Sequence, residues 1–351
     1  NWIDSNLEIR QESGGGTYCY FAEANDPETL SDDGMFHYDR DDRILYFRTE
    51  GDVDPSGLTI TALFDAVTDL PVGPDSGWLP HATSPDVYEA PLYSEYHLLM
   101  TYEVHIDGVM LDRIGAASSL GDGSYLGLDI TDMHAGSFWL DRKGSKLCIW
   151  LEDDSDPRLD TVEVSVRPHL LRCGNYFLIE GITFSHTAGA AYIWDAAAKL
   201  GSDCTVSNCS FLLCDNIAVG FADGSHDTKI INSNISSNGN SGVHAGVGSE
   251  IVLEGCKILS NNYRDFLSSW HAGGIKIIPD AYGTVEGCEI AWNRGNGVWF
   301  DYCDSGGEIL IRRSYIHDNR DNGVFIEMSR NATIINNVVA RNGGIGIDIR
   351  W

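Results

Sequence analysis

Short blocks of apolar and polar positions recur through the second half of the chain. Between residues 175 and 351, a small residue is repeatedly followed by residues that favour β-strands. We place seven copies, beginning at Ala190, Ala218, Gly242, Gly274, Gly297, Gly323 and Gly346. By subtraction, successive copies are 28, 24, 32, 23, 26 and 23 residues apart. A period in the twenties with a strand in every copy predicts a solenoid.

Two further columns of residues accompany the strands. One column is asparagine: Asn238, Asn261, Asn293, Asn319 and Asn342. Another, further upstream in each copy, is small or soft: Gly181, Cys209, Ser233, Cys256, Cys288, Ser314 and Asn337. Buried asparagines repeated from turn to turn can hydrogen-bond along a stack. Regular leucines and 3.6-residue periodicity are absent from the pattern, which argues against leucine-rich and helical repeats.

Alternation within the strands separates an inner from an outer face, because successive side chains of a strand point to opposite sides. The first residue after the small one is apolar and is expected inside the coil: Val243, Ile275, Val298, Val324 and Ile347. The second and fourth residues are expected outside. The second column reads His244, Lys276, Trp299, Phe325 and Asp348, and the fourth reads Gly246, Ile278, Asp301, Glu327 and Arg350.

Asp301 and Glu327 thereby occupy the same outer column on neighbouring turns. Parallel strands lie about 4.8 Å apart, and two carboxyl groups about 5–5.5 Å apart suit a glycosidase that retains anomeric configuration. We expect Glu327 to be the general acid/base and Asp301 the nucleophile. The alternative is that both are solvated acids on an acidic surface.

Other outer residues are candidates for binding substrate. Trp299 and Phe325 could stack on a sugar ring, or pack against a neighbouring loop. Lys276 could position hydroxyl groups or tune Asp301. The remaining candidates are His244, His271 (in the inserted residues of the longest copy), Asp348 and Arg350, and the last two could equally form an ion pair with each other.

The repeats, together with Gly273-Gly-Ile-Lys, Trp299-Phe-Asp and Phe325-Ile-Glu, resemble the pectate-lyase-like superfamily of right-handed parallel β-helix carbohydrate-active enzymes. The chain is most similar to its glycoside hydrolases of xylosidase and fucosidase type, which carry one Asp and one Glu on successive turns. This resemblance implies an all-β chain with a right-handed, single-stranded parallel β-helix, in which Asp301 and Glu327 are the catalytic pair.

The first half of the chain reads differently. Residues 1–168 are β-rich and contain a duplication: Phe36-His-Tyr-Asp-Arg recurs as Phe138-Trp-Leu-Asp-Arg, 102 positions later by subtraction. Asp107-Gly108 predicts a hairpin turn, and residues 68–98 a long loop. We expect residues 1–168 to be an accessory module, resembling those that precede the coil in some β-helix glycosidases and serving to cap it, and residues 169–351 to be the catalytic β-helix.

Composition limits the kinds of molecule that the chain is expected to bind and indicates where it is expected to act. The formal net charge of −29 argues against nucleic-acid binding. No run of 18 apolar residues is present, so no membrane association is expected, and no signal peptide is visible; a secreted, periplasmic or extracellular location is expected. Nine cysteines do not form paired zinc motifs. The oligomeric state is left open.

Three functions remain open. The first is a retaining glycoside hydrolase that cleaves a neutral plant or algal oligo- or polysaccharide and needs no metal. The second is a polysaccharide lyase that acts on a uronate-containing glycan, with Lys276 as base and Ca²⁺ bound by Asp301 and Glu327. The third is a glycan-binding β-helix without catalytic activity.

Overall fold

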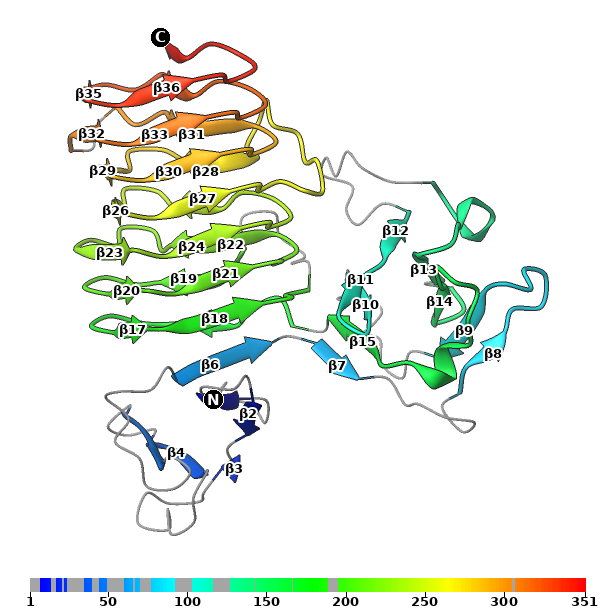
Figure 1. Cartoon of the computed structure of the whole chain (residues 1–351). Coiled ribbons are helices and arrows are strands. Elements are labelled where there is room, and N and C mark those ends of the chain that lie inside the picture. Colours follow the sequence, from blue (N-terminus) through cyan, green and yellow to red (C-terminus); the bar gives the residue numbers. More distant parts are fainter. Residues whose placement is uncertain are drawn as a thin grey trace.

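The computed structural model describes residues 77–91, 103–115, 127–141, 143–165, 167–188, 195–304 and 307–351, and the backbone of seven strands between residues 7 and 69. A parallel β-helix stands beside a smaller β-rich module (Figure 1). No helix among these residues is long and apolar enough to cross a membrane.

Three sheets run along the β-helix, and the strands of successive turns pair in parallel within each sheet. The eight-stranded sheet, which carries the predicted site, contains β16 (Leu171–Arg172), β19 (Ala196–Leu200), β22 (Ile217–Phe221), β25 (Val243–Ala245), β28 (Gly273–Ile277), β31 (Asn296–Asp301), β34 (Val324–Glu327) and β37 (Ile347–Arg350). The seven-stranded sheet contains β17 (Leu178–Glu180), β20 (Thr205–Ser207), β23 (Thr228–Ile231), β26 (Glu250–Glu254), β29 (Tyr282–Glu286), β32 (Ile309–Arg312) and β35 (Ala332–Ile335).

The ten-stranded sheet is longer because it recruits strands from the first half of the chain. It contains β2 (Thr17–Tyr20), β1 (Leu7–Ser13), β6 (Ile60–Asp65), β18 (Ile182–Ser185), β21 (Ser210–Leu212), β24 (Asn234–Ser236), β27 (Lys257–Leu259), β30 (Glu289–Ala291), β33 (Tyr315–His317) and β36 (Val338–Ala340). β6 pairs parallel with β18, and β1 pairs antiparallel with β6. The sheet therefore crosses the boundary that the sequence suggested at residue 168, and β6 covers the strand edge that β18 would otherwise expose.

The module itself has two sheets. One contains β11 (Val109–Met110), β10 (Val104–Ile106), β15 (Val162–Ser165) and β7 (Val67–Asp69); the other contains β12 (Asp112–Ile114), β13 (Ser137–Asp141), β14 (Lys146–Trp150), β9 (Tyr88–Pro91) and β8 (Leu79–Pro80). A further sheet contains β3 (Ala22–Glu23), β4 (Met35–Asp39) and β5 (Ile44–Arg48). Two short 3₁₀ helices occupy Ile130–Asp132 and Pro157–Leu159.

The predicted duplication corresponds to two antiparallel hairpins, β4–β5 and β13–β14, whose strands begin 102 positions apart by subtraction. The predicted turn at Asp107-Gly108 joins β10 to β11, and both turn residues have positive φ (48° and 78°), as a type I′ turn requires. The predicted loop over 68–98 is wrong in part, because β9 lies within it and pairs with β14.

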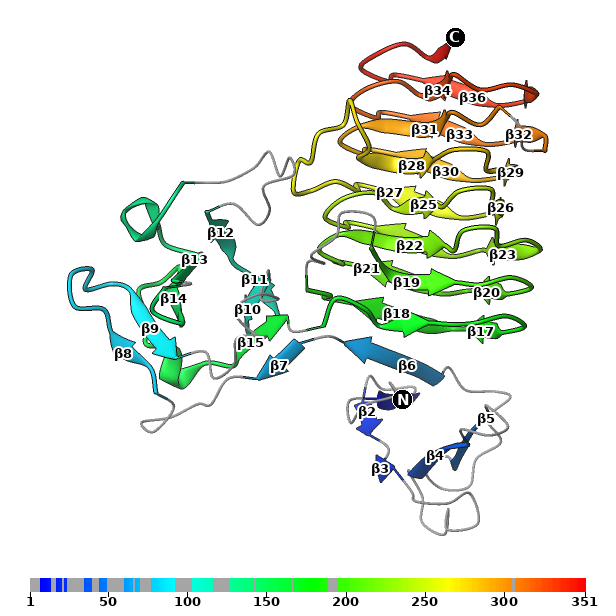
Figure 2. The same cartoon turned by 180° about the vertical axis from the view of Figure 1, so that it is seen from behind.

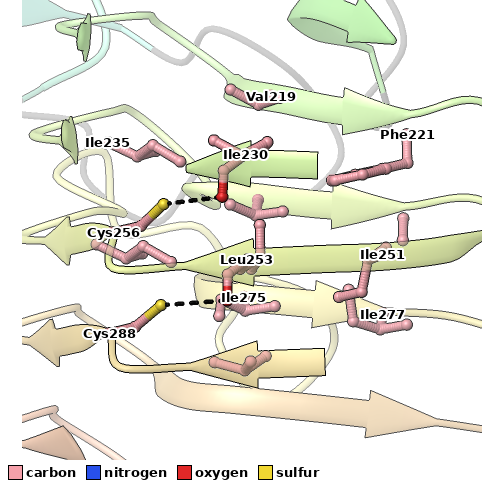
Figure 3. Packing of buried hydrophobic residues seen from close by; sticks show 14 of the residues in the cluster. Val219, Phe221, Ile230, Ile235, Ile251, Leu253, Cys256, Ile275, Ile277 and Cys288 are labelled. Atoms are coloured by element: carbon pink, nitrogen blue, oxygen red, sulfur yellow. Dashed lines mark hydrogen bonds between the residues drawn. The ribbon is translucent and has the colours of Figure 1, made fainter. Parts of the chain in front are cut away.

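The core of the coil follows the predicted alternation except at β37, the last described strand, where Ile347 was expected inside but is 44% exposed. Val243, Ile275, Val298 and Val324 are 0–2% exposed and belong to one continuous cluster. Figure 3 shows this cluster, with the thiols of Cys256 and Cys288 directed to the carbonyl oxygens of Ile230 and Leu253. The cysteine column is therefore packed in the core, and the eight cysteines whose side chains the structure describes are all free.

The asparagine column forms a continuous ladder, as predicted. Each amide Nδ2 donates to Oδ1 of the next asparagine, at 2.8–2.9 Å, through Asn238, Asn261, Asn293, Asn319 and Asn342. The ladder explains the small residue in each copy: a Cβ on Gly297 would lie 2.6 Å from the Gly323 carbonyl oxygen and 2.9 Å from Asn319 Nδ2.

The first predicted copy does not fit this register. Residues 190–194 lie outside the described residues, and the strand that pairs with β22 is β19, at Ala196–Leu200. The copy at Ala218 is placed correctly, because Val219 pairs with Val243.

Candidate functional site

Asp301 and Glu327 are direct neighbours at the ends of β31 and β34, where they pair in register. The residues before them, Phe300 and Ile326, are buried in the coil (0% and 1% exposed). The two acids therefore point to the outer face, as the alternation predicted. The side chain of Asp301 is 19% exposed, so it is within reach of a bound molecule. Their catalytic roles stay predictions.

Lys276 is the closest charged partner of Asp301. Its Nζ donates a 2.7 Å hydrogen bond to Asp301 Oδ2, although its own side chain is only 2% exposed. The same Nζ lies 3.0 Å from the centroid of the Trp299 ring. Burial lowers the pKa of Lys276 to about 8, and the hydrogen bond to Asp301 opposes this shift.

Two buried polar atoms of the site have no hydrogen-bond partner within the part of the chain that the structure describes. They are Oδ1 of Asp301 and Nε1 of Trp299. Such atoms are rare because leaving them unpaired costs free energy. Asp301 therefore has one carboxylate oxygen held by Lys276, and its other oxygen is buried without a hydrogen-bond partner among the described residues.

The expected sugar-stacking platform is not present in the predicted form. Trp299 and Phe325 are 3% and 8% exposed, and their rings stack on each other at 5.1 Å between centroids. Lys276 covers the indole, and the Arg350 guanidinium lies 5.5 Å from the Phe325 ring. Trp299 and Phe325 do lie on the outer face of the coil, but their ring faces are covered by each other and by the neighbouring cations.

Exposed aromatic side chains occur instead in the connections that precede or follow the strands of this sheet. Tyr302, which directly follows Asp301, is 56% exposed, and Trp270 in the inserted loop is 45% exposed. Sequence reasoning passed over both residues because they lie outside the strand columns. The sequence did contain a sign of both residues, because each is a large aromatic residue in a polar connection next to a candidate site residue.

The other predicted binding residues are close to the acid pair or to Lys276. Asp348 pairs in register with Phe325, and Arg350 with Glu327. Arg350 and Asp348 form an ion pair at 2.7 Å, which was the alternative expected for them. Asp348 also accepts a hydrogen bond from Asn322, at 3.3 Å.

The two histidines are buried rather than exposed to a cleft. His244 Nδ1 lies 3.1 Å from the main-chain oxygen of Lys276, and burial lowers its pKa to about 3. His271 is 1% exposed, packs its ring against Phe266 and Trp270, and has a pKa lowered by burial to about 4. The positive charge of Lys276 contributes to both shifts. Both imidazoles are therefore neutral at pH 7.

A cavity of about 410 Å³ lies away from these residues, between the tip of the module hairpin and turns of the coil. Met110, Tyr263, Trp292 and Arg294 are among the residues that line it. None of the predicted site residues does so. In the described ranges, the two clusters with the spacing of metal ligands also leave out Asp301 and Glu327. The possible Ca²⁺ site at this pair stays a prediction.

Comparisons with known proteins place the fold. A family model described as "Right handed beta helix region" matches residues 142–264 and 264–350. A solved structure titled "The complex structure of XylC with xylose" is 12% identical, with a TM-score of 0.56, over 92% of this chain and 63% of that one. The chain thus spans less than two thirds of that protein's length.

A second structure, titled "Glycoside hydrolase", is 10% identical, with a TM-score of 0.43, over 82% of this chain and 83% of that chain. No curated protein matches the chain. The family model covers more than half of the sequence, and its two matches include the strands that carry Lys276, Asp301 and Glu327. The chain belongs to the right-handed β-helix family.

Proposed function

We propose that this chain is a glycoside hydrolase that cleaves a neutral glycan with retention of anomeric configuration, using Asp301 as nucleophile and Glu327 as general acid/base. One observation carries the proposal. Asp301 is held by the Lys276 ammonium and stands in register with a second carboxyl group, that of Glu327, on the next strand.

The chemistry follows from this arrangement. Glu327 protonates the glycosidic oxygen as the bond breaks, while the Asp301 carboxylate bonds to the anomeric carbon and forms a glycosyl–enzyme intermediate. Glu327 then takes a proton from water, which attacks the same carbon and releases Asp301. Lys276 holds the nucleophile in one orientation through Oδ2, and an oriented nucleophile lowers the entropic part of the barrier.

Similarity to known proteins supports the substrate class. The solved structure that matches over 92% of this chain is of a protein whose title names xylose. The exposed ring of Tyr302, which directly follows Asp301, provides an apolar face beside the acid pair, and aromatic faces suit the apolar side of a sugar ring. We expect a neutral sugar, since the chain carries a net charge of −29.

The test uses a panel of aryl glycosides. Hydrolysis should release the aryl group, and proton NMR should show a first-formed sugar with the same anomeric configuration as the substrate. Asp301→Asn and Glu327→Gln should each abolish turnover while the circular dichroism spectrum stays unchanged. An inverted product, or near-normal turnover by Glu327→Gln, would contradict the assignment.

A polysaccharide lyase remains the second candidate, on the strength of the lowered pKa of Lys276 (about 8). A neutral amine could abstract a proton beside a uronate carboxylate. The position of Nζ counts against this, because it is held between Asp301 and the Trp299 ring. Lyase action on a uronate polymer would leave an unsaturated product that absorbs near 235 nm, whereas hydrolysis would not.

A further inference from the structure

Three side chains converge where the module meets the coil, far along the chain from the acid pair. Glu103 directly precedes β10, His105 lies in β10, and His186 directly follows β18 of the coil. In both views of the molecule β10 lies beside the first turns of the coil (Figures 1 and 2). Glu103 and His105 are alternate residues of one extended segment, so both side chains point to the same side.

Two of the three side chains are buried, and the third is partly exposed. The side chains of Glu103 and His105 are 1% and 2% exposed, and that of His186 is 22% exposed. The three residues can each offer one ligand atom, and these atoms lie within 4.8 Å of one another. A carboxylate buried in this way needs a compensating positive charge. The nearby guanidinium of Arg264 is engaged in an ion pair with Asp215.

The distances within the cluster are at the long end for hydrogen bonds and match the spacing of metal ligands. Glu103 Oε2 lies 3.3 Å from His105 Nε2 and 3.5 Å from His186 Nδ1. Hydrogen bonds between nitrogen and oxygen are usually about 2.7–3.2 Å long. In a tetrahedral site with bonds of about 2.0–2.1 Å, neighbouring ligand atoms are about 3.3–3.4 Å apart. One oxygen at this spacing from two nitrogens describes two edges of such a tetrahedron.

Neighbouring groups orient the carboxylate. The Tyr263 hydroxyl donates a 2.7 Å hydrogen bond to the other carboxylate oxygen, Glu103 Oε1. The Glu103 main-chain N–H donates to Ser165 Oγ at 2.9 Å, which holds the segment against β15. Oε2 is therefore directed to the two imidazoles. Partners of this kind, bound to the outer atoms of a ligand, are a general feature of metal sites.

We propose that Glu103, His105 and His186 bind a divalent transition-metal ion that joins the module to the coil. Two imidazoles and one carboxylate suit Zn²⁺, whereas Ca²⁺ and Mg²⁺ prefer oxygen ligands alone. The ion is structural in this position: its ligands come from both parts of the chain, and Tyr263 adds the inserted loop of the coil to the same cluster. The proposal is independent of the proposed hydrolase activity.

The experiment titrates the full chain, after EDTA treatment and dialysis, with Zn²⁺ in a calorimeter. We expect one Zn²⁺ per chain and no binding of Ca²⁺ or Mg²⁺ at this site. Free Zn²⁺ at 100 times the dissociation constant should raise the ratio of folded to unfolded protein about 100-fold, seen as a higher melting temperature. X-ray absorption of the Zn²⁺-loaded wild type should show nitrogen and oxygen ligands at about 2.0–2.1 Å with imidazole scattering.

Variants connect the binding to these residues. Tyr263→Phe keeps all three ligands and should weaken Zn²⁺ binding by about 10- to 100-fold. His186→Ala removes a ligand and should weaken it further. His226→Ala is the matched control, because His226 lies in an exposed Asp203–His226–Asp227 cluster and its loss should leave this binding unchanged.

Three results would overturn the proposal. The first is wild-type protein that takes up no Zn²⁺, and the second is equal uptake by wild type and His186→Ala. The third is an absorption spectrum without imidazole scattering, which needs no variant and so decides the question even if His186→Ala fails to fold. Each would mean that the three side chains form only a hydrogen-bonded cluster.

Discussion

The ammonium group of Lys276 lies 2.7 Å from Oδ2 of Asp301, although the two residues are on adjacent strands and two positions out of register. Lys276 pairs with Trp299, so its side chain crosses the indole ring to reach Asp301. The aromatic ring and the carboxylate therefore hold the same cation.

Replacing Lys276 tests whether this orientation matters for catalysis. Lys276→Met keeps most of the side-chain volume but frees Asp301 to rotate, and misplacement of a reacting group by about 1 Å can cost about 100-fold in rate. We expect kcat on the best aryl glycoside to fall by about that factor, with a smaller change in KM. Lys257→Met, at an exposed position of β27, is the control and should behave as wild type. An unchanged kcat in Lys276→Met would show that the contact serves stability only.

The pH dependence of activity separates the two enzymatic functions. Burial lowers the pKa of Lys276 to about 8 from its ordinary value of 10.5. A hydrolase that needs the ammonium to orient Asp301 should lose activity as the pH rises through about 8. A lyase that uses the neutral amine as base should gain activity over the same range. The pH profile of kcat/KM therefore favours one function and contradicts the other.

Stability should respond to the same group. Because the pKa of Lys276 is lower in the folded than in the unfolded chain, the unfolded chain binds more protons between about pH 8 and 10.5. The contribution of Lys276 to stability should therefore increase as the pH rises through this range, by on the order of 3 kcal/mol. The measurement is urea unfolding at pH 7.5 and pH 10. Wild type should gain stability relative to Lys276→Met, and parallel profiles for the two proteins would contradict the assignment.

Much of the coil was predictable from sequence because each turn repeats the same residue types at the same structural positions. The inner column, the asparagine ladder and the pairing of Asp301 with Glu327 all follow from a strand alternation of two and a repeat length near 25 residues. The predicted position of the first copy was wrong. Ala190 is a small residue at a plausible spacing, but the strand that pairs with β22 begins at Ala196.

Side-chain environment was less predictable than register. Sequence alternation placed Trp299 and Phe325 outside the coil but could not show that Lys276 and Arg350 would cover their rings. The Glu103–His105–His186 cluster was also beyond its reach, since no repeat links the module to the coil. A Glu-x-His pair on one strand is a weak signal until a third ligand is known.

The buried histidine of the site should make the protein sensitive to acid. Burial lowers the pKa of His244 to about 3 from its ordinary value of 6.5. Between about pH 6.5 and pH 3, His244 is therefore protonated in the unfolded chain but neutral in the folded chain. Stability is therefore lost as the pH falls from about 6.5 towards 3, by a few kcal/mol. His244→Gln should remove part of this loss, measured as the difference in unfolding free energy between pH 7 and pH 4.5. His226→Gln, at an exposed position, should leave it unchanged, and equal acid sensitivity in the His244 variant would contradict the prediction.

The asparagine ladder should contribute most where it is fully buried. Asn293 accepts from the side chain and main chain of Asn261 and donates to Asn319 and to the Ile258 carbonyl oxygen. Asn293→Ala would leave several buried groups unpaired at once, and each unpaired group costs about 1–3 kcal/mol. We expect a loss of at least about 3 kcal/mol in the free energy of unfolding, measured with urea. The matched control is Asn342→Ala at the last described rung, where the asparagine is partly exposed and water can replace the lost bonds. It should cost about 1 kcal/mol, and equal losses in the two variants would show that the ladder stabilises the coil no more in its interior than at its end.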